Sequence, residues 1–508
     1  MFPGRLACSV AMRDTTGGSA IFRTVFGQWR NDVVTWEQRP SNGTGPATAD
    51  DLQSKCRLRS CHNSDRFVTL QNKIMSVQYS TSDRSAKAIS ENLERQIDAG
   101  TYAGGDALPT IRALAEELNV SPTTVNAAFA ILRARGRIVG KRRGGSIVVA
   151  RLPLQSVTEP SMLPGRDLAV ANPDPAFLPL LKPTVARVSG ERRLYTDIAD
   201  NERLVALFRA HVMADAVAGA HIGIASGAMD AIERGLMSMT APGDVIGLED
   251  PTYPPYLPLA RALGLQVVRM EIDEFGITPE ALTRAVRARA KAIVVVPRAQ
   301  NPTGASFDPR RARALRTILK DAPEVGVLED DYLAMICGMP LHSITAGRLR
   351  WLHVRSFAKT IGPDIRVAPF ACDELTLARI VARQRIGCGW VSNLLQDTAF
   401  ALLAAPATKR LTRAATVGYT KRRLAFLSAC KRHGLAAAGF SGLTVWIAVA
   451  DEAVAIRAAL GAGFAIDGGS RYRSAESPPA VRVTITTIDE AEADALAVAL
   501  AAANWQLP

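Results

Sequence analysis

A lysine in the second half of the chain has neighbours whose types and spacing point to covalent chemistry. Lys359 stands three residues after Ser356 and seven residues before Arg366. A buried lysine amine can form a Schiff base with an aldehyde, and a serine with an arginine can hold a phosphate, the arginine through its forked donors. An aldehyde and a phosphate on one small molecule indicate pyridoxal 5'-phosphate (PLP). Taken alone, the segment is equally consistent with a surface lysine in a loop.

Ser226, Gly227 and Ala228 are candidates for a second phosphate contact. They follow an apolar stretch at 222–225 and precede a predicted helix at 230–239. Backbone amides at a helix N-terminus favour phosphate binding. Many strand-to-helix turns of this composition bind no ligand, so this turn indicates a phosphate site only in combination with the lysine segment.

Four further side chains follow predicted strands and suit a flat aromatic cofactor. Tyr253, on a proline-bounded loop, can stack on a ring, and Asn301 can donate to a phenolate oxygen. A carboxylate such as Asp330, with Asp331 as the alternative, can keep a pyridine nitrogen protonated, which makes the ring an electron sink. Tyr332 can add a hydrogen bond to the phenolate oxygen. Packed tyrosines and common loop turns are the ordinary explanations for each feature alone. No ligand spacing accompanies the acidic pair, so we predict no metal site.

A mainly parallel sheet is expected to position these residues. From about residue 166 onward, apolar strands alternate with amphipathic helices, which is typical of a parallel sheet covered on both faces. The clearest predicted strands are 245–248, 266–270, 292–296 and 325–328, and the clearest helices are 278–289 and 309–319.

An earlier stretch, residues 81–150, is predicted to fold as a separate unit. Apolar residues recur at helical spacing from Ala86 to Ile97, Thr110 is a plausible cap for a second helix, and Ser121 with Pro122 opens a third. Two short strands, joined by a basic turn at 140–145, complete the unit. Three helices and a hairpin predict a winged helix-turn-helix, whose last helix enters the major groove of DNA and whose basic hairpin lies against phosphates.

Composition limits the remaining possibilities. A chain of 508 residues with 48% hydrophobic residues can form two or three domains, and its net charge of +13 permits a polyanionic partner. No apolar run reaches the ~18 residues of a membrane span, and we see no secretory signal. Seven scattered cysteines fit a reducing cytoplasm better than zinc or a disulfide framework.

Two further segments complete the predicted domain organisation. Residues 1–80 lack periodicity and are predicted to be a disordered extension, and we hypothesise that residues 1–74 are an over-called reading frame preceding a start at Met75. Residues 151–165 contain three prolines and predict a linker. The large α/β region then extends over 166–508.

The unit at 81–150 resembles the GntR-type DNA-binding domain, chiefly through residues 108–115 and 120–125. The resemblance implies backbone contacts from Arg112. Asn126 stands where the family often has a basic residue, so the preferred DNA sequence is not carried over. The implied groove contacts are Ser121, Thr123, Thr124 and Asn126, and the implied phosphate contacts of the wing are Lys141, Arg142 and Arg143.

The region from 166 to 505 resembles fold-type I aminotransferases, with a mainly parallel central sheet and a smaller α+β C-terminal subdomain. Together with the GntR-type unit it is similar to the MocR subfamily and its PtsJ-type branch, through residues 172–175, 297–304 and 355–366. The resemblance implies that Lys359 forms the Schiff base with PLP. The implied cofactor contacts are Ser226, Gly227, Ala228, Tyr253, Asn301, Asp330, Tyr332, Ser356, Arg366 and, from a partner subunit, Tyr195.

The same resemblance implies a substrate site. Arg482 would take the α-carboxylate of an amino acid, and Asn172 would lie where the family closes over its substrate. The sequence departs from the family after Tyr195, where residues 198–201 replace a glycine-containing turn. This departure makes the sequence a weaker indication of a dimer contact at Tyr195.

Three functions compete at this point. The first is a transcriptional regulator, a homodimer on double-stranded DNA, that senses PLP or a PLP–amine adduct and controls vitamin B6 or amino-compound metabolism. The second is a working PLP-dependent aminotransferase with a fused DNA-binding domain. The third is a DNA-binding scaffold that has lost its cofactor. The site residues are the same for the first two, and the fused winged helix favours regulation.

Overall fold

The computed structural model describes residues 84–134, 137–141, 145–148, 165–188, 192–196, 200–217, 221–474 and 477–505. The extension predicted at 1–80 lies outside the described residues, as does the linker predicted at 151–165 apart from Gly165. Arg142 and Arg143 of the predicted wing also lie outside them. The described residues form a smaller body before residue 150 and a larger body from residue 165.

The smaller body has the three helices and the hairpin that the sequence predicts. Its elements are α3 (Ala86–Asp98), α4 (Ile111–Leu118), α5 (Pro122–Ala134), β1 (Ile138–Lys141) and β2 (Gly145–Val148), the two strands being antiparallel. Thr110 caps α4 by accepting a hydrogen bond from the Ala113 amide, and Asn119 ends α4 with a left-handed φ of 50°. Leu93, Leu114 and Phe129 meet in its core.

An eight-stranded sheet forms the centre of the larger body. Its order is β4-β11-β10-β9-β8-β5-β6-β7. Every pairing from β10 to β6 is parallel, whereas β11 and β7 are antiparallel to their neighbours, so the sheet is mainly parallel as predicted. The strands are β4 (His221–Ala225), β5 (Val245–Asp250), β6 (Gln266–Asp273), β7 (Gly276–Ile277), β8 (Ala292–Val295), β9 (Gly326–Asp331), β10 (Trp351–Arg355) and β11 (Ala368–Cys372).

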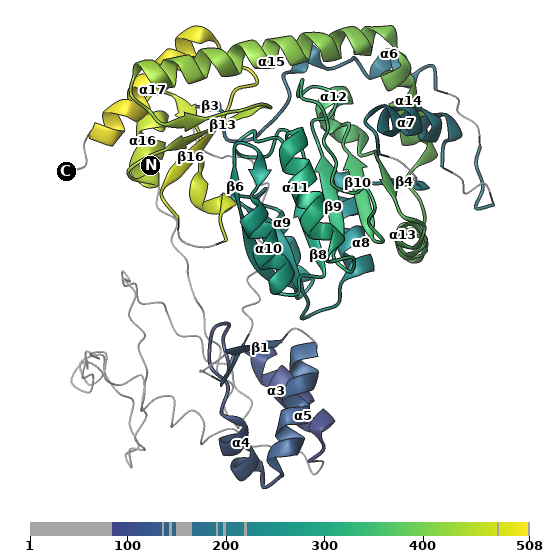
Figure 1. Ribbon diagram of the computed structural model, residues 1–508, viewed down its shortest axis with the longest axis vertical. Coiled ribbons are helices and arrows are strands. Elements are labelled where there is room, and N and C mark those ends of the chain that lie inside the picture. Colours follow the sequence, from purple (N-terminus) through teal and green to yellow (C-terminus); the bar gives the residue numbers. More distant parts are fainter. Residues whose placement is uncertain are drawn as a thin grey trace, which may run out of the picture. The chain divides into compact units, whose positions relative to one another are not determined.

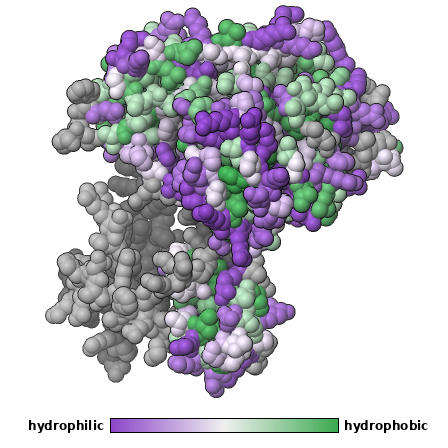
Figure 2. All heavy atoms as spheres, in the orientation of Figure 1, coloured by the Kyte–Doolittle hydropathy of each residue, from purple (hydrophilic) through white to green (hydrophobic). Residues whose placement is uncertain are grey.

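Helices cover both faces of this sheet because successive side chains of a strand point to opposite faces. Ala292 and Val294 of β8 pack with α8 (Ala228–Met239) and α9 (Tyr256–Ala262), whereas Ile293 and Val295 pack with α10 (Pro279–Arg287) and α11 (Pro309–Lys320). Figure 2 shows hydrophilic residues gathered over the outward side of α10 and α11. The two helices are therefore amphipathic, with their apolar sides packed on the sheet and their polar sides facing outward.

The remaining helices of the larger body flank this sheet or lead away from it. Leu204 and Phe208 of α7 pack with Ala399 and Leu402 of α14 beside the sheet. The elements are η1 (Pro175–Phe177), α6 (Lys182–Val185), α7 (Glu202–Ala214), α12 (Ala358–Ile361), η2 (Pro363–Ile365), α13 (Glu374–Ile386) and α14 (Asn393–Ala404).

A smaller subdomain follows the long helix α15 (Pro406–Arg432), which Figure 1 shows running along the larger body toward the C-terminal elements. Its four-stranded sheet has the order β12-β13-β16-β15, and β3 pairs in parallel with β14 beside it. Among the described helices, none is both long and apolar enough to cross a membrane. The elements are β3 (Arg166–Asp167), β12 (Ala437–Ala438), β13 (Thr444–Ala448), α16 (Glu452–Gly461), β14 (Phe464–Ala465), β15 (Asp467–Gly468), η3 (Gly469–Tyr472), β16 (Ala480–Thr484) and α17 (Glu490–Trp505).

Candidate functional site

A cavity of about 460 Å³ lies at the carboxyl ends of the parallel strands and reaches the C-terminal subdomain. In open α/β sheets this edge is where ligands bind. Of the residues singled out from the sequence, nine line it: Ala228, Tyr253, Asn301, Asp330, Tyr332, Ser356, Lys359, Arg366 and Arg482. Residues up to 254 positions apart in the sequence, Ala228 and Arg482, are thus brought together by the fold.

Lys359 lies in α12, just after β10, and its amine faces the cavity. Nζ donates a hydrogen bond to the backbone oxygen of Ala171. Burial, together with the positive charge of Arg482, lowers the pKa of Lys359 to about 8. A larger share of the amine is therefore neutral near neutral pH than in a surface lysine, and the neutral amine is the nucleophile.

Asp330 is 5% exposed, lines the cavity and has one oxygen without a partner. Its Oδ2 accepts a 2.5 Å hydrogen bond from the hydroxyl of Tyr256, whereas its Oδ1 is buried without a partner. Burial raises the pKa of Asp330 to about 6, against the opposing effect of the Tyr256 hydrogen bond. A buried acceptor without a donor is costly, so this atom is suited to a cationic N–H of a ligand.

Asp331, the alternative carboxylate, points to the other face of β9. Arg298 and Arg355 donate to its two oxygens at 2.7 to 3.0 Å, and both arginines also reach Asp215. Burial alone would raise the pKa of Asp331, but these two guanidinium groups hold it well below its usual range. Asp331 is therefore a fixed member of a buried ion network, and Asp330 is the carboxylate that faces the cavity.

The predicted ring contacts have different surroundings. The side-chain oxygen of Asn301 is buried without a partner. Tyr253 meets Tyr256 edge to face, with ring centroids 5.6 Å apart. The hydroxyl of Tyr332 donates to the backbone oxygen of Ala299 at 2.8 Å, so its proton is already engaged. Asn301 and Tyr253 have free polar or aromatic surface for a ligand, and Tyr332 keeps oxygen lone pairs only.

The predicted phosphate contacts are partly assembled. Gly227 adopts a φ of 106° at the start of α8, and a Cβ added there would collide with the guanidinium of Arg366. Gly227, Ser356 and Arg366 line a smaller cavity that adjoins the first one through shared residues. Ser226 lines neither cavity, although its backbone oxygen accepts a 3.3 Å hydrogen bond from Arg366. Glycine is thus required for the close approach of Arg366.

Arg482 is a buried cation without an anionic partner in the described part of the chain. It is 3% exposed, its Nε has no hydrogen-bond acceptor, and its guanidinium lies 5.2 Å from the ring centroid of Tyr472. Burying an unpaired charge is expensive. A carboxylate of a ligand would supply the missing counterion.

Asn172 and Tyr195 stand apart from the cavity. Asn172 is exposed, and the cavity is lined instead by the three residues before it, Ala169 to Ala171. Tyr195 is 83% exposed and meets Trp390 edge to face at 5.8 Å. Neither residue reaches the cavity of its own chain.

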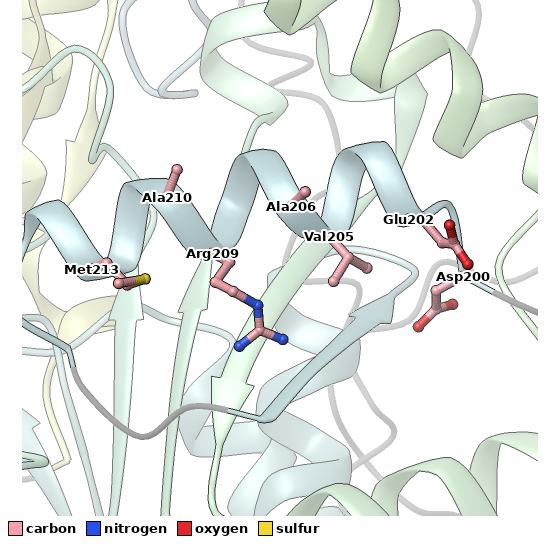
Figure 3. A pocket seen from close by; sticks show the side chains of 7 residues that line it. All are labelled: Asp200, Glu202, Val205, Ala206, Arg209, Ala210 and Met213. Carbon is pink, nitrogen blue, oxygen red and sulfur yellow. The ribbon is translucent and has the colours of Figure 1, made fainter.

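A second cavity, of about 370 Å³, lies along α7. Figure 3 shows that one face of the helix forms its wall, with Asp200 and Glu202 at one end and Arg209 nearer the middle. It shares no lining residue with the lysine cavity. Across the described residues, no group of His, Cys, Asp and Glu side chains is arranged to hold a metal ion.

Residues that the sequence interpretation missed support the site from behind. Tyr256 fixes Asp330, as described above. Glu249 accepts hydrogen bonds from the Val296 amide and from Gln300, the residue before Asn301, at 3.0 and 3.1 Å. Burial raises the pKa of Glu249 to about 8. The repeated tyrosine, three residues after Tyr253, was the signal that could have revealed Tyr256; nothing local marks Glu249.

The DNA-contact candidates of the smaller body lie on α4 and α5. Arg112, Thr123 and Asn126 are exposed, and Thr124 is half-buried. Ser121 is engaged in capping, since its Oγ accepts from the Thr124 amide at 3.1 Å. Lys141 ends β1. The exposed positions on α5 are therefore those that a groove could receive.

Comparisons with known proteins identify both bodies. Residues 169–500, more than half of the chain, match the family model of class I and II aminotransferases, and residues 85–148 match that of bacterial regulatory proteins of the gntR family. The vitamin B6 salvage pathway transcriptional repressor PtsJ of Salmonella typhimurium is 34% identical over 82% of this chain and 97% of its own length. The pyridoxine biosynthesis transcriptional regulator PdxR of Corynebacterium glutamicum is 27% identical over 66% of this chain and 76% of its own.

Solved structures agree on the fold of the larger body. The kynurenine aminotransferase of Pyrococcus horikoshii superimposes with a TM-score of 0.61 at 20% identity, over 68% of this chain and 92% of that one. The predicted fold class is confirmed by this likeness and by the two family matches. The chain belongs to the class I and II aminotransferase family in its larger body and, as a whole, to the MocR subfamily of GntR-type transcriptional regulators.

Proposed function

We propose that this protein is a DNA-binding transcriptional regulator whose larger body binds PLP and senses the cofactor or its adduct with an amino compound. The observation that carries the proposal is the cavity in which Lys359, a lysine with a lowered pKa, and Asp330, a carboxylate with one unpartnered oxygen, are brought together. Lys359 would bond to the aldehyde of PLP. When bound, PLP supplies a reactive aldehyde and an electron-accepting ring.

The residues present fit this cofactor. The unpartnered Oδ1 of Asp330 suits the pyridine N–H. The side-chain NH2 of Asn301, which lines the cavity, would donate to the phenolate oxygen. Tyr253 would stack on the ring. The backbone at Gly227, with Ser356 and Arg366, would hold the phosphate at the N-terminus of α8. Ser226 remains a proposed phosphate contact through its hydroxyl, because its amide already donates to Oδ2 of Asp230 at 3.0 Å. Tyr332 remains a proposed contact of the phenolate oxygen, for which its hydroxyl would have to turn away from Ala299.

An amino compound with a carboxylate is the proposed second ligand. Arg482 supports this proposal, because it is a buried guanidinium without an anionic partner among the described residues. Asn172 is exposed beside the cavity, so it would have to move in order to close over this ligand as proposed. Ligand binding would change DNA affinity if the ligand favours one arrangement of the protein over another.

The proposed partner of the smaller body is an operator in double-stranded DNA. The gntR family match and the exposed positions of α5 support this role. Thr123, Thr124 and Asn126 are the proposed groove contacts, Ser121 lies at the helix cap, and Arg112 is the proposed backbone contact. Lys141, Arg142 and Arg143 remain proposed phosphate contacts of the wing.

We further propose a cytoplasmic homodimer that places two DNA-reading units on two half-sites. Tyr195 supports it, because an 83% exposed aromatic ring remote from the cavity of its own chain suits a contact with a second copy. Relatives named for vitamin B6 salvage and pyridoxine biosynthesis make vitamin B6 metabolism the proposed target.

Aminotransferase activity is the second candidate function. One observation favours it: Lys359, Asp330 and Arg482 line the same cavity, so the groups that transamination needs are present together. Regulation without turnover needs the same groups, and the fused gntR-type unit favours regulation.

Footprinting upstream of the protein's own gene and its neighbours, with and without PLP, tests the proposal. We expect protection of two half-sites whose extent or affinity changes when PLP is added. Equal, weak protection of all sequences, combined with conversion of amino acids to 2-oxo acids, would support the enzyme instead.

A further inference from the structure

A segment at the wall of the cavity, residues 169–173, is hydrogen-bonded by the lysine itself. Before it, Leu168 is bonded to both neighbouring strands: its amide donates to Ala465 and its oxygen accepts from Thr484, each at 2.8 Å. After it, the amide of Asp174 donates to the hydroxyl of Tyr419 at 2.9 Å. The segment is thus anchored at both ends.

Between these anchors, hydrogen bonds to the rest of the protein are scarce. The amides of Ala169 and Val170 donate to Asp167, and that of Asn172 donates to Val170, so these bonds are local. Within the described residues, one hydrogen bond joins 169–173 to a distant part of the chain, and Lys359 donates it, to the oxygen of Ala171. We call this segment the bridge.

The bridge also forms part of the cavity and begins close to the linker. Ala169, Val170 and Ala171 line the cavity. The described larger body starts at Gly165, four residues before the bridge, and the preceding residues join it to the DNA-binding unit. A change in the bridge therefore occurs close to the point where the DNA-binding unit is attached.

Bonding of Lys359 to an aldehyde is incompatible with its bond to the bridge. Nζ of the neutral amine attacks the aldehyde carbon, a C=N bond forms, and both amine hydrogens leave with the aldehyde oxygen as water. The imine nitrogen would carry no hydrogen in its neutral form and, in its protonated form, one hydrogen that the adjoining phenolate oxygen would accept. The hydrogen bond to Ala171 must break.

We propose that Lys359 is a latch: its free amine holds the bridge at the wall of the cavity, and covalent attachment of the cofactor releases it. The released bridge is the first structural change through which cofactor binding reaches the DNA-binding unit. The inference rests on the proposed function, since it assumes that PLP bonds to Lys359. It adds the regulatory step that the proposed function leaves open.

Hydrogen exchange of the full-length protein tests the latch. We expect the bridge amides to exchange on the order of fivefold faster in cofactor-free Lys359→Met than in cofactor-free wild type, since one hydrogen bond is lost. PLP-loaded wild type should match the variant. Tyr419→Phe is the matched control, because it removes the anchoring bond at Asp174 and keeps the latch. Equal rates in wild type and Lys359→Met, or the same increase in Tyr419→Phe, would overturn the proposal.

DNA affinity gives the second readout. Cofactor-free Lys359→Met should bind the operator as PLP-loaded wild type does and should not respond to PLP. If the variant instead binds as cofactor-free wild type does, release of the bridge is not the signal. If PLP leaves the DNA affinity of wild type unchanged, the proposed sensing function fails, and the exchange rates still decide whether the latch exists.

Discussion

Tyr256 donates a 2.5 Å hydrogen bond to Oδ2 of Asp330, and Oδ1 of the same carboxylate has no partner among the described residues. One oxygen of Asp330 is therefore held by the protein and the other is available to a ligand. In the proposed site, Tyr256 would act on the cofactor through Asp330 and is a positioning residue. Its effect is measurable because it opposes the rise in pKa that burial imposes on Asp330.

Tyr256→Phe should raise the pKa of Asp330 above its value of about 6, because burial remains and the hydrogen bond that lowers the pKa is lost. PLP binding needs Asp330 in its carboxylate form, so the affinity for PLP falls as the pH drops through the pKa of Asp330. In the variant this fall should begin at higher pH. Fluorescence titration of PLP binding across pH 5 to 8 measures this shift in the pH dependence of affinity. Both proteins are titrated with the same PLP, so the ionisation of its phosphate affects them equally. Superimposable pH profiles of PLP affinity for the variant and wild type would contradict the assigned role of Tyr256.

Lys359 should react with PLP at a rate that rises with pH through about 8, where its amine becomes half neutral. Arg482→Met removes a positive charge that helps to lower this pKa, so the midpoint should move to higher pH. Stopped-flow absorbance of the visible band gives both midpoints. Arg471→Met is the control, since this half-exposed arginine pairs with Asp467 at the cavity wall. A midpoint unmoved by Arg482→Met would contradict the electrostatic coupling.

Gly227→Ala should weaken PLP binding through the phosphate, because the added Cβ collides with the guanidinium of Arg366. The residue would also be strained at a φ of 106°, which costs about 1–3 kcal/mol of stability. Gly243→Ala separates the two effects, since Gly243 has a φ of 93° and no atom within 4 Å of the added Cβ. We expect both variants to unfold at lower temperature and Gly227→Ala alone to lose PLP affinity.

Asn126→Arg should change the base preferred under α5. An asparagine amide pairs with adenine, whereas an arginine pairs with the acceptor edge of guanine, and each pairing discriminates by about 1–3 kcal/mol. Selection from randomised half-sites should exchange an adenine for a guanine. Arg112→Ala, a change at a proposed phosphate contact, should instead weaken all sites equally and reduce the salt dependence. An unchanged preference in Asn126→Arg would remove Asn126 from the groove.

The sequence predicted those site residues best that lie at the carboxyl ends of parallel strands. Tyr253, Asn301, Asp330 and Lys359 each follow or end a parallel strand, and such strand ends meet at one edge, so the order of the motifs was enough to predict their proximity. The winged helix was predictable for a related reason, because its caps and apolar periods are local.

Pairings across the fold were not predictable. Tyr256 lies 74 residues from Asp330, and no local pattern links them. The choice between Asp330 and Asp331 follows from the two-residue period of β9 only once the face that bears the cavity is known. Asn172 was expected over the substrate, but within the bridge its amide donates to Val170 and the residue is exposed beside the cavity. The proposed role of Tyr195 needs a second copy of the chain, which a single sequence does not describe.

PLP bonded to Lys359 is predicted to change the affinity of this protein for its operator. The most direct test of this prediction is the Kd of full-length wild type for the footprinted operator, with and without PLP, with the visible absorbance of the same samples recorded. A change in Kd that tracks the absorbance of the covalent cofactor, on the order of fivefold or more, is the predicted result. Full occupancy of Lys359 by PLP with an unchanged Kd would contradict it.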